Sequence, residues 1–185
     1  MTGMLRFLVI LVLLGMLTTA RGQEIYWDPL RPLQWQDFKQ RVGMGGVFKA
    51  YTYTGIRYEI TDSSGYAHIT VSAYFLPQDS WVFTRFCSDN LLLHEQYHFH
   101  IAAYHARLME EAFAKYEVPL DEFMDGNLMQ EIRREFNSMY EQVEATQELY
   151  DKQTDHGIRE EEQQRWVEEL NKSLNLNPSS PQQTD

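Results

Sequence analysis

The hydrophobic pattern of this 185-residue chain changes period near residue 88, and that change decides the fold class. Between residues 46 and 86 apolar and polar side chains alternate, as they do in half-buried strands. After residue 88 the apolar positions recur at helical spacing. Strands followed by helices predict an α+β fold, with a small antiparallel sheet in the N-terminal half and a helical C-terminal half.

The strands are expected where the alternation is clearest. Every second side chain over residues 67–75 is apolar, which predicts one strand with a buried face. Neighbouring strands are expected near residues 51–53 and 56–60, followed by a turn at residues 62–65. A further strand is expected over residues 80–86, directly before the helical region.

Three helices are expected in the second half of the chain. Ser88 or Asp89 can cap a helix that runs to about residue 116, where Pro119 prevents its continuation. The second helix is expected over residues 126–150. The third, which is acidic, is expected over residues 160–174.

The N-terminus has the composition of a signal peptide. Residues 7–17 form an apolar run of 11 residues, which is too short to span a bilayer. Small side chains allow cleavage after Ala20 or after Gly22, so residues 1–22 are expected to be removed. No cysteine follows for lipid attachment, and we therefore expect an extracytoplasmic protein, periplasmic or secreted, without a membrane anchor.

Composition limits what the mature chain can be. Residues 23–174 are expected to form one domain, and the polar tail at residues 175–185 is expected to be disordered. The single cysteine, Cys87, excludes an internal disulfide and a four-thiolate zinc site. Residues 101–170 hold 18 acidic against 7 basic side chains, which accounts for the net charge of −11 and argues against a nucleic-acid partner.

The chemistry of the chain is concentrated at an HExxH motif, formed by His94, Glu95 and His98. On a helix the two histidines project from one face about 6 Å apart in rise, so that one metal ion can bind both. Glu95 lies at the edge of that face, where its carboxylate can take a proton from a water activated by the metal. The alternative is a pair of structural histidines without a metal.

A third zinc ligand is expected downstream, because catalytic zinc usually has three protein ligands and an open position. His156 is the first choice, since the adjacent Gly157 can turn the chain back toward the first helix. Asp151 is an alternative, as are Glu144 and Glu148 on the second helix.

Two further histidines are excluded as ligands of the same ion. His105 lies about 10.5 Å along the helix axis from His98, whereas nitrogen ligands of one zinc ion stand within about 4 Å of each other. His100 points away from His94 around the helix, and we expect it to be solvated or hydrogen-bonded.

Three segments together carry a resemblance to a known family: LLLHEQYHFHIAAYHAR, the later YDKQTDHG with Gln163 and Trp166 following, and the early LQWQDFK. They resemble the bacterial domain-of-unknown-function family 922, whose members look like secreted, zincin-type zinc metallopeptidases. The likeness spans about residues 25–170. It implies a zincin-type helical half, zinc ligands at His94 and His98, a catalytic base at Glu95 and a third ligand at His156.

These observations predict an extracytoplasmic zinc peptidase that binds one Zn²⁺ per chain and acts on a peptide or protein substrate. Tyr150 could donate to the oxyanion, Asp151 or Asp155 could orient a ligand histidine, and Trp81 could line the substrate cleft. The alternatives are a catalytically inactive metal-binding protein of the cell envelope and an interaction protein whose acidic helices bind basic partners.

Overall fold

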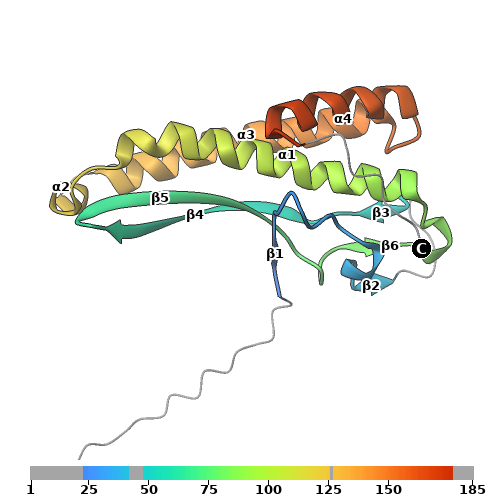
Figure 1. Cartoon of the computed structure of the whole chain (residues 1–185), viewed down its shortest axis with the longest axis horizontal. Helices are drawn as coiled ribbons and strands as arrows, with labels where there is room; N and C mark the ends of the chain where they lie inside the picture. Colours follow the sequence, from blue (N-terminus) through green and yellow to red (C-terminus); the bar gives the residue numbers. More distant parts are fainter. Residues whose placement is uncertain (1–22, 42–47, 126, 177–185) are drawn as a thin grey trace, which may run out of the picture.

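The computed structural model describes residues 23–41, 48–125 and 127–176. The predicted signal peptide and most of the predicted tail lie outside these residues, so both stay predictions. The described elements comprise short strands and a long hairpin followed by long helices, which confirms the α+β class (Figure 1).

A long hairpin dominates the first sheet. Strand β4 (Thr54–Ser63) pairs antiparallel with β5 (Tyr66–Phe75) along its whole length. The turn between them has positive φ angles at Ser64 and Gly65, 56° and 85°, as in the tight turns that follow the twist of a hairpin. Strand β1 (Ile25–Tyr26) pairs with the other edge of β5, which gives the order β1-β5-β4.

A second, smaller sheet lies beside one end of the hairpin. Its order is β2 (Gln40–Arg41), β6 (Trp81–Val82) and β3 (Ala50–Tyr51). Strand β3 is antiparallel to β6, whereas β2 is parallel to it, so this sheet is not purely antiparallel. The strand predicted at residues 80–86 is shorter than expected, because the chain turns into a 3-10 helix at Thr84–Phe86.

The helices begin where the period changes. Helix α1 (Asp89–Phe113) is capped by Ser88, whose hydroxyl accepts from the backbone N–H of Leu91 at 3.2 Å. A 3-10 helix (Ala114–Tyr116) follows α1, and the short helix α2 (Leu120–Asp125) then leads into α3. Helix α2 lies in a segment where no helix was expected.

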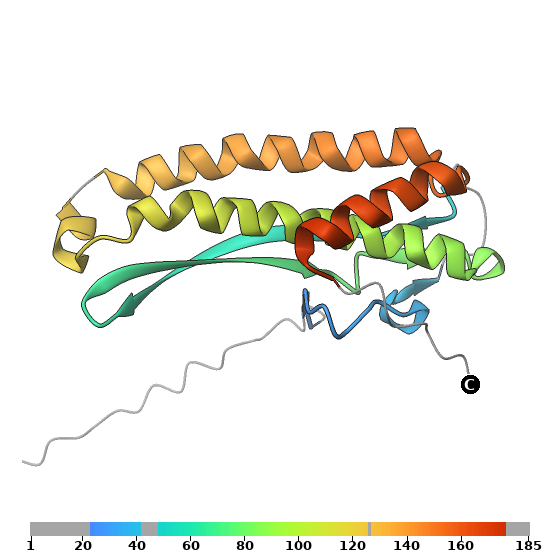
Figure 2. The same cartoon turned by 45° about the horizontal axis from the view of Figure 1, so that its top comes forward.

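The long helices cover one face of the hairpin. Helix α1 packs on β4 and β5, while α3 (Leu128–Thr154) and α4 (Glu160–Leu174) both pack against α1 (Figure 2). Helix α3 extends four residues beyond its expected end. No helix among the described residues is long and apolar enough to cross a membrane.

Two apolar clusters hold these layers together. The larger lies between the hairpin and α1, and the predicted face of β5 is buried in it: Ala67, Ile69, Val71, Ala73 and Phe75. The smaller cluster, formed by Tyr97, Ile101, Tyr150 and Leu170, lies where α1, α3 and α4 meet. This second cluster fixes α3 against the part of α1 that carries the HExxH motif.

Candidate metal centre

Three side chains from two helices converge on one point. The Nε2 atoms of His94 and His98 lie 3.2 Å apart, and the Oδ1 atom of Asp151 lies 3.1 Å from each of them. Tetrahedral ligands about 2.0–2.1 Å from a zinc ion stand about 3.3 Å from one another. The donor types and the spacing therefore fit a metal ion, and these residues form a group that could hold one.

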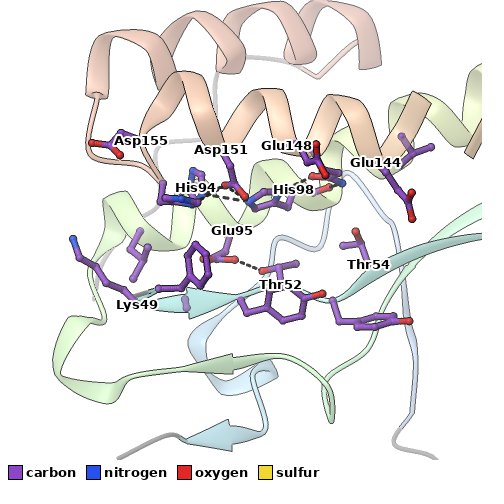
Figure 3. A pocket seen from close by; sticks show the side chains of 18 of the residues that line it. Lys49, Thr52, Thr54, His94, Glu95, His98, Glu144, Glu148, Asp151 and Asp155 are labelled. Carbon is purple, nitrogen blue, oxygen red and sulfur yellow. Dashed lines mark hydrogen bonds and ion pairs between the residues drawn. The ribbon is translucent and has the colours of Figure 1, made fainter. Parts of the chain in front are cut away.

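The two helices present these ligands because of how they pack. His94 and His98 are one turn apart on α1, and Asp151 reaches them from the last turn of α3 (Figure 3). The ring of Tyr150, fully buried, stacks on the imidazole of His94 with centroids 4.7 Å apart. Its hydroxyl donates to the backbone oxygen of His94 at 3.3 Å. Tyr150 therefore packs against α1 and is not among the residues that line the cavity.

Burial and hydrogen bonding set the charges at the centre. Burial alone would raise the pKa of Asp151, but hydrogen bonds to His94 and His98 hold it well below its ordinary value. Burial lowers the pKa of His94. For His98 burial acts in the same direction, yet the contact with Asp151 and the nearby carboxylates outweigh it and raise the pKa. Asp151 is thus an ionised carboxylate that faces two imidazoles.

A glutamine orients the second histidine. The Nε2 atom of Gln147 donates to the backbone oxygen of His98 at 2.9 Å, and this bond fixes which way the amide points. Its Oε1 atom is then the acceptor for Nδ1 of His98. With the proton on Nδ1, the lone pair of Nε2 faces Asp151 and His94, which is the tautomer that a metal ligand needs.

Glu95 lies beside the three ligands and is almost completely buried, with 3% of its surface exposed. The hydroxyl of Thr52 donates to its Oε2 atom at 2.6 Å. Thr52 directly follows β3, so the small sheet holds the carboxylate from the side opposite α1 (Figure 3). Glu95, His94 and His98 all line the same cavity, as the proposed base and ligands of a hydrolytic site would.

The loop after α3 returns the chain to this centre. Asp155, His156 and Gly157 have positive φ angles of 50°, 53° and 81°, which reverse the chain sharply. The Nδ1 atom of His156 lies 3.2 Å from the same Oδ1 atom of Asp151 that faces the other histidines. His156 therefore lies next to the group formed by His94, His98 and Asp151 but outside it.

A family model described as a bacterial protein of unknown function, DUF922, matches residues 34–157. This match covers about two thirds of the chain. The chain belongs to the DUF922 family. No curated protein and no solved structure matches it. The DUF922 segment includes the HExxH motif, Asp151 and His156, and it ends at Gly157, so α4 lies beyond it.

The cavity of this DUF922 protein measures about 770 Å³ and lies between α1, α3 and the segment that contains β3. Two other predicted candidates, Glu144 and Glu148, line its wall, as does Asp155, but none of them joins the three converging ligands. Trp81 is not among the residues that line the cavity. It lies on β6, the central strand of its sheet, and stacks on Tyr51 with centroids 6.3 Å apart.

The other histidines of α1 have partners away from the cavity. His100 is buried and accepts from the indole N–H of Trp27 at 2.9 Å, so it is hydrogen-bonded and not solvated. His105 is buried and contacts the hydroxyl of Thr146 at 3.0 Å. No sequence pattern indicated that Thr52 or Gln147 lies beside the centre, since neither belongs to a recognisable motif. Gln163 is part of the family resemblance, but no role was predicted for it.

Proposed function

We propose that this protein is an extracytoplasmic zinc peptidase in which Glu95 is the general base. The observation that carries the proposal is the position of Glu95, buried on the wall of the same cavity as a compact His94, His98 and Asp151 group. A carboxylate next to a two-histidine metal site is the arrangement that metal-assisted hydrolysis requires. Export rests on the predicted signal peptide.

The proposed zinc ligands are His94, His98 and Asp151. Their donor atoms are already 3.1–3.2 Å apart, so little movement is needed to bind an ion. The prediction that His156 supplies the third ligand stays open, since its Nδ1 atom is within 3.2 Å of Asp151. In either case three protein side chains would hold the ion, and a fourth position would be left for a water.

The chain's own groups have separate tasks in this proposal. When bound, zinc would supply a water with a pKa near 7 and would polarise a carbonyl oxygen. The carboxylate of Glu95 accepts the proton of the attacking water and returns it to the leaving amine. The hydroxyl of Thr52, hydrogen-bonded to Oε2 at 2.6 Å, keeps that carboxylate in one orientation.

The cavity supports a peptide substrate. Strand β3 is at an edge of its sheet, and residues 50–54 line the cavity next to Glu95. An edge strand can pair with an extended peptide through main-chain hydrogen bonds. We assign peptide pairing to β3 and not to β6, because β6 is already paired on both sides.

The deciding experiment compares Glu95→Gln with the wild type and with Glu144→Gln, which changes another carboxylate on the cavity wall. Zinc content is measured by elemental analysis, and hydrolysis is measured on a library of unstructured peptides. We expect about one zinc per chain in all three proteins and a loss of about 10²–10⁴-fold in hydrolysis for Glu95→Gln alone. Zinc binding without hydrolysis in the wild type would instead support a binding protein of the envelope.

A further inference from the structure

Two buried polar atoms next to the metal centre have no hydrogen-bond partner among the residues that the structure describes. They are Nδ1 of His94 and Oε1 of Gln163, a residue of α4. Both side chains are almost completely buried, with 2% of each residue exposed. An unpaired buried polar atom is costly, and here one atom can donate a hydrogen bond while the other can accept one.

The two groups border the same small gap at Gly157. A Cβ atom added to Gly157 would lie 3.1 Å from Oε1 of Gln163 and 3.2 Å from Cγ of His94. The absence of a side chain at Gly157 therefore lets both His94 and Gln163 pack closely against this residue. The positive φ angle of 81° gives a second reason why this position suits glycine.

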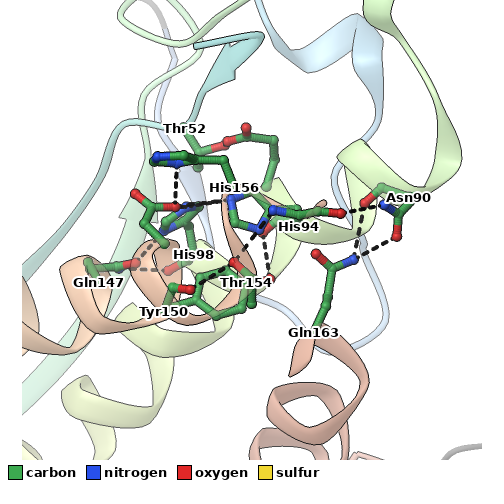
Figure 4. Close-up of polar contacts among 12 residues, drawn as sticks. Thr52, Asn90, His94, His98, Gln147, Tyr150, Thr154, His156 and Gln163 are labelled. Atoms are coloured by element: carbon green, nitrogen blue, oxygen red, sulfur yellow. Dashed lines mark hydrogen bonds and ion pairs between the residues drawn. The ribbon is translucent and has the colours of Figure 1, made fainter. Parts of the chain in front are cut away.

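The orientation of the Gln163 amide is fixed by its other contacts. Its Nε2 atom donates to Oδ1 of Asn90 at 2.9 Å and to the backbone oxygen of Asn90 at 3.2 Å. Asn90 is itself oriented, because its Nδ2 atom donates to the backbone oxygen of Gly157 at 2.7 Å. A reversed amide would set Oε1 against two acceptors, so Oε1 must point away from Asn90 (Figure 4).

We propose that Gln163 is a positioning residue whose Oε1 atom accepts the Nδ1 proton of His94. With the proton held on Nδ1, the lone pair of Nε2 is directed at Asp151 and His98, where the metal would bind. Gln147 already makes the same kind of contact to His98 from α3. This inference rests on the proposed metal centre, but it does not depend on catalysis.

Helix α4 would thus support the metal centre through Gln163, although the three converging side chains lie on α1 and α3. Without an acceptor at Nδ1, His94 would favour the other tautomer, in which Nε2–H donates to Asp151. That proton would have to leave before a metal could bind. By holding the proton on Nδ1, Gln163 keeps Nε2 of His94 free of a proton that would compete with the metal.

The test measures zinc affinity by chelator competition in the purified protein. Gln163→Leu removes the acceptor, and Gln164→Leu is the matched control, because Gln164 is an exposed neighbour on α4. We expect zinc to bind about 10–100-fold more weakly in Gln163→Leu and equally well in Gln164→Leu.

Nitrogen-15 spectra of the zinc-loaded protein give an independent readout. The Nδ1 proton of His94 should be protected from exchange in the wild type and in Gln164→Leu, and it should exchange rapidly in Gln163→Leu. Equal zinc affinity in Gln163→Leu and the wild type, or a rapidly exchanging Nδ1 proton in the wild type, would overturn the role of Gln163. Zinc binding without peptide hydrolysis would overturn only the proposed peptidase.

Discussion

The ring of Tyr150 lies almost parallel to the imidazole of His94, with 16° between the two planes and 4.7 Å between their centroids. The next residue along α3 is Asp151, whose carboxylate meets His94 and His98. A buried aromatic contact thus fixes the position of α3 along α1, and with it the position of the third converging ligand.

Replacing Tyr150 therefore separates packing from hydrogen bonding. Tyr150→Ala should lower the free energy of unfolding by about 3–5 kcal/mol and weaken zinc binding, because the stack and its volume are lost. Tyr150→Phe should cost about 1 kcal/mol or less, since only the long bond to the His94 carbonyl is removed. Urea unfolding and chelator competition measure both effects. Equal stability of Tyr150→Ala and the wild type would refute the structural role of the ring.

The identity of the third ligand can be decided by comparing Asp151→Asn with His156→Ala. We expect the greater loss of zinc affinity in Asp151→Asn, because Oδ1 of Asp151 lies 3.1 Å from both ligand nitrogens. The reverse order of affinities would assign the third position to His156. Circular dichroism of each variant checks that the fold is retained.

Thr52→Val tests the support of the general base. The substitution keeps the shape of the side chain but removes the hydrogen bond of 2.6 Å to Glu95. We expect kcat/KM for peptide hydrolysis to fall by about tenfold, which corresponds to about 1.4 kcal/mol, with zinc content unchanged. Thr54→Val, at another threonine of the cavity wall, is the control. A similar loss in both variants would show that the effect is not specific to Glu95.

Stability should fall below neutral pH partly through His105. Burial lowers its pKa in the folded protein, so the unfolded chain takes up the proton more readily. The contribution of the neutral His105 imidazole to the free energy of unfolding is therefore fully present above about pH 6.5, and it is lost as the pH decreases. Urea unfolding at pH 7.5 and pH 5.5 should show a smaller loss in His105→Gln than in the wild type. An equal loss in His105→Gln and the wild type would show that His105 does not cause the effect.

The sequence predicts the parts of this site that depend on local spacing. His94, Glu95 and His98 share a helix face, and the Ser88 cap and the buried face of β5 follow from the same periodicities. The segment around Asp151 and His156 was also expected to supply a ligand. Which of the two converges with the histidines depends on how α3 packs on α1, and that packing involves residues distant in sequence.

The supporting residues could not be predicted, for a related reason. Thr52, Gln147 and Gln163 are polar side chains from the segment after β3, from α3 and from α4, and each hydrogen-bonds to residues of α1 that are distant in sequence. Similarly, the strand expected at residues 80–86 ends early because the chain turns at Thr84, directly before the Ser88 cap. Secondary-structure propensity depends on residues that are close in sequence, so it does not predict these tertiary contacts.

The ligands of the metal centre lie on two helices, and His98 and Asp151 are 53 positions apart in the chain. An ion held by both would act as a cross-link that closes this long loop and restricts the unfolded state. At a free zinc concentration 100-fold above Kd, the linkage adds about 2.7 kcal/mol to stability. Zinc supply would then govern the lifetime of the chain as well as its chemistry, because the unloaded form opens more often to proteases.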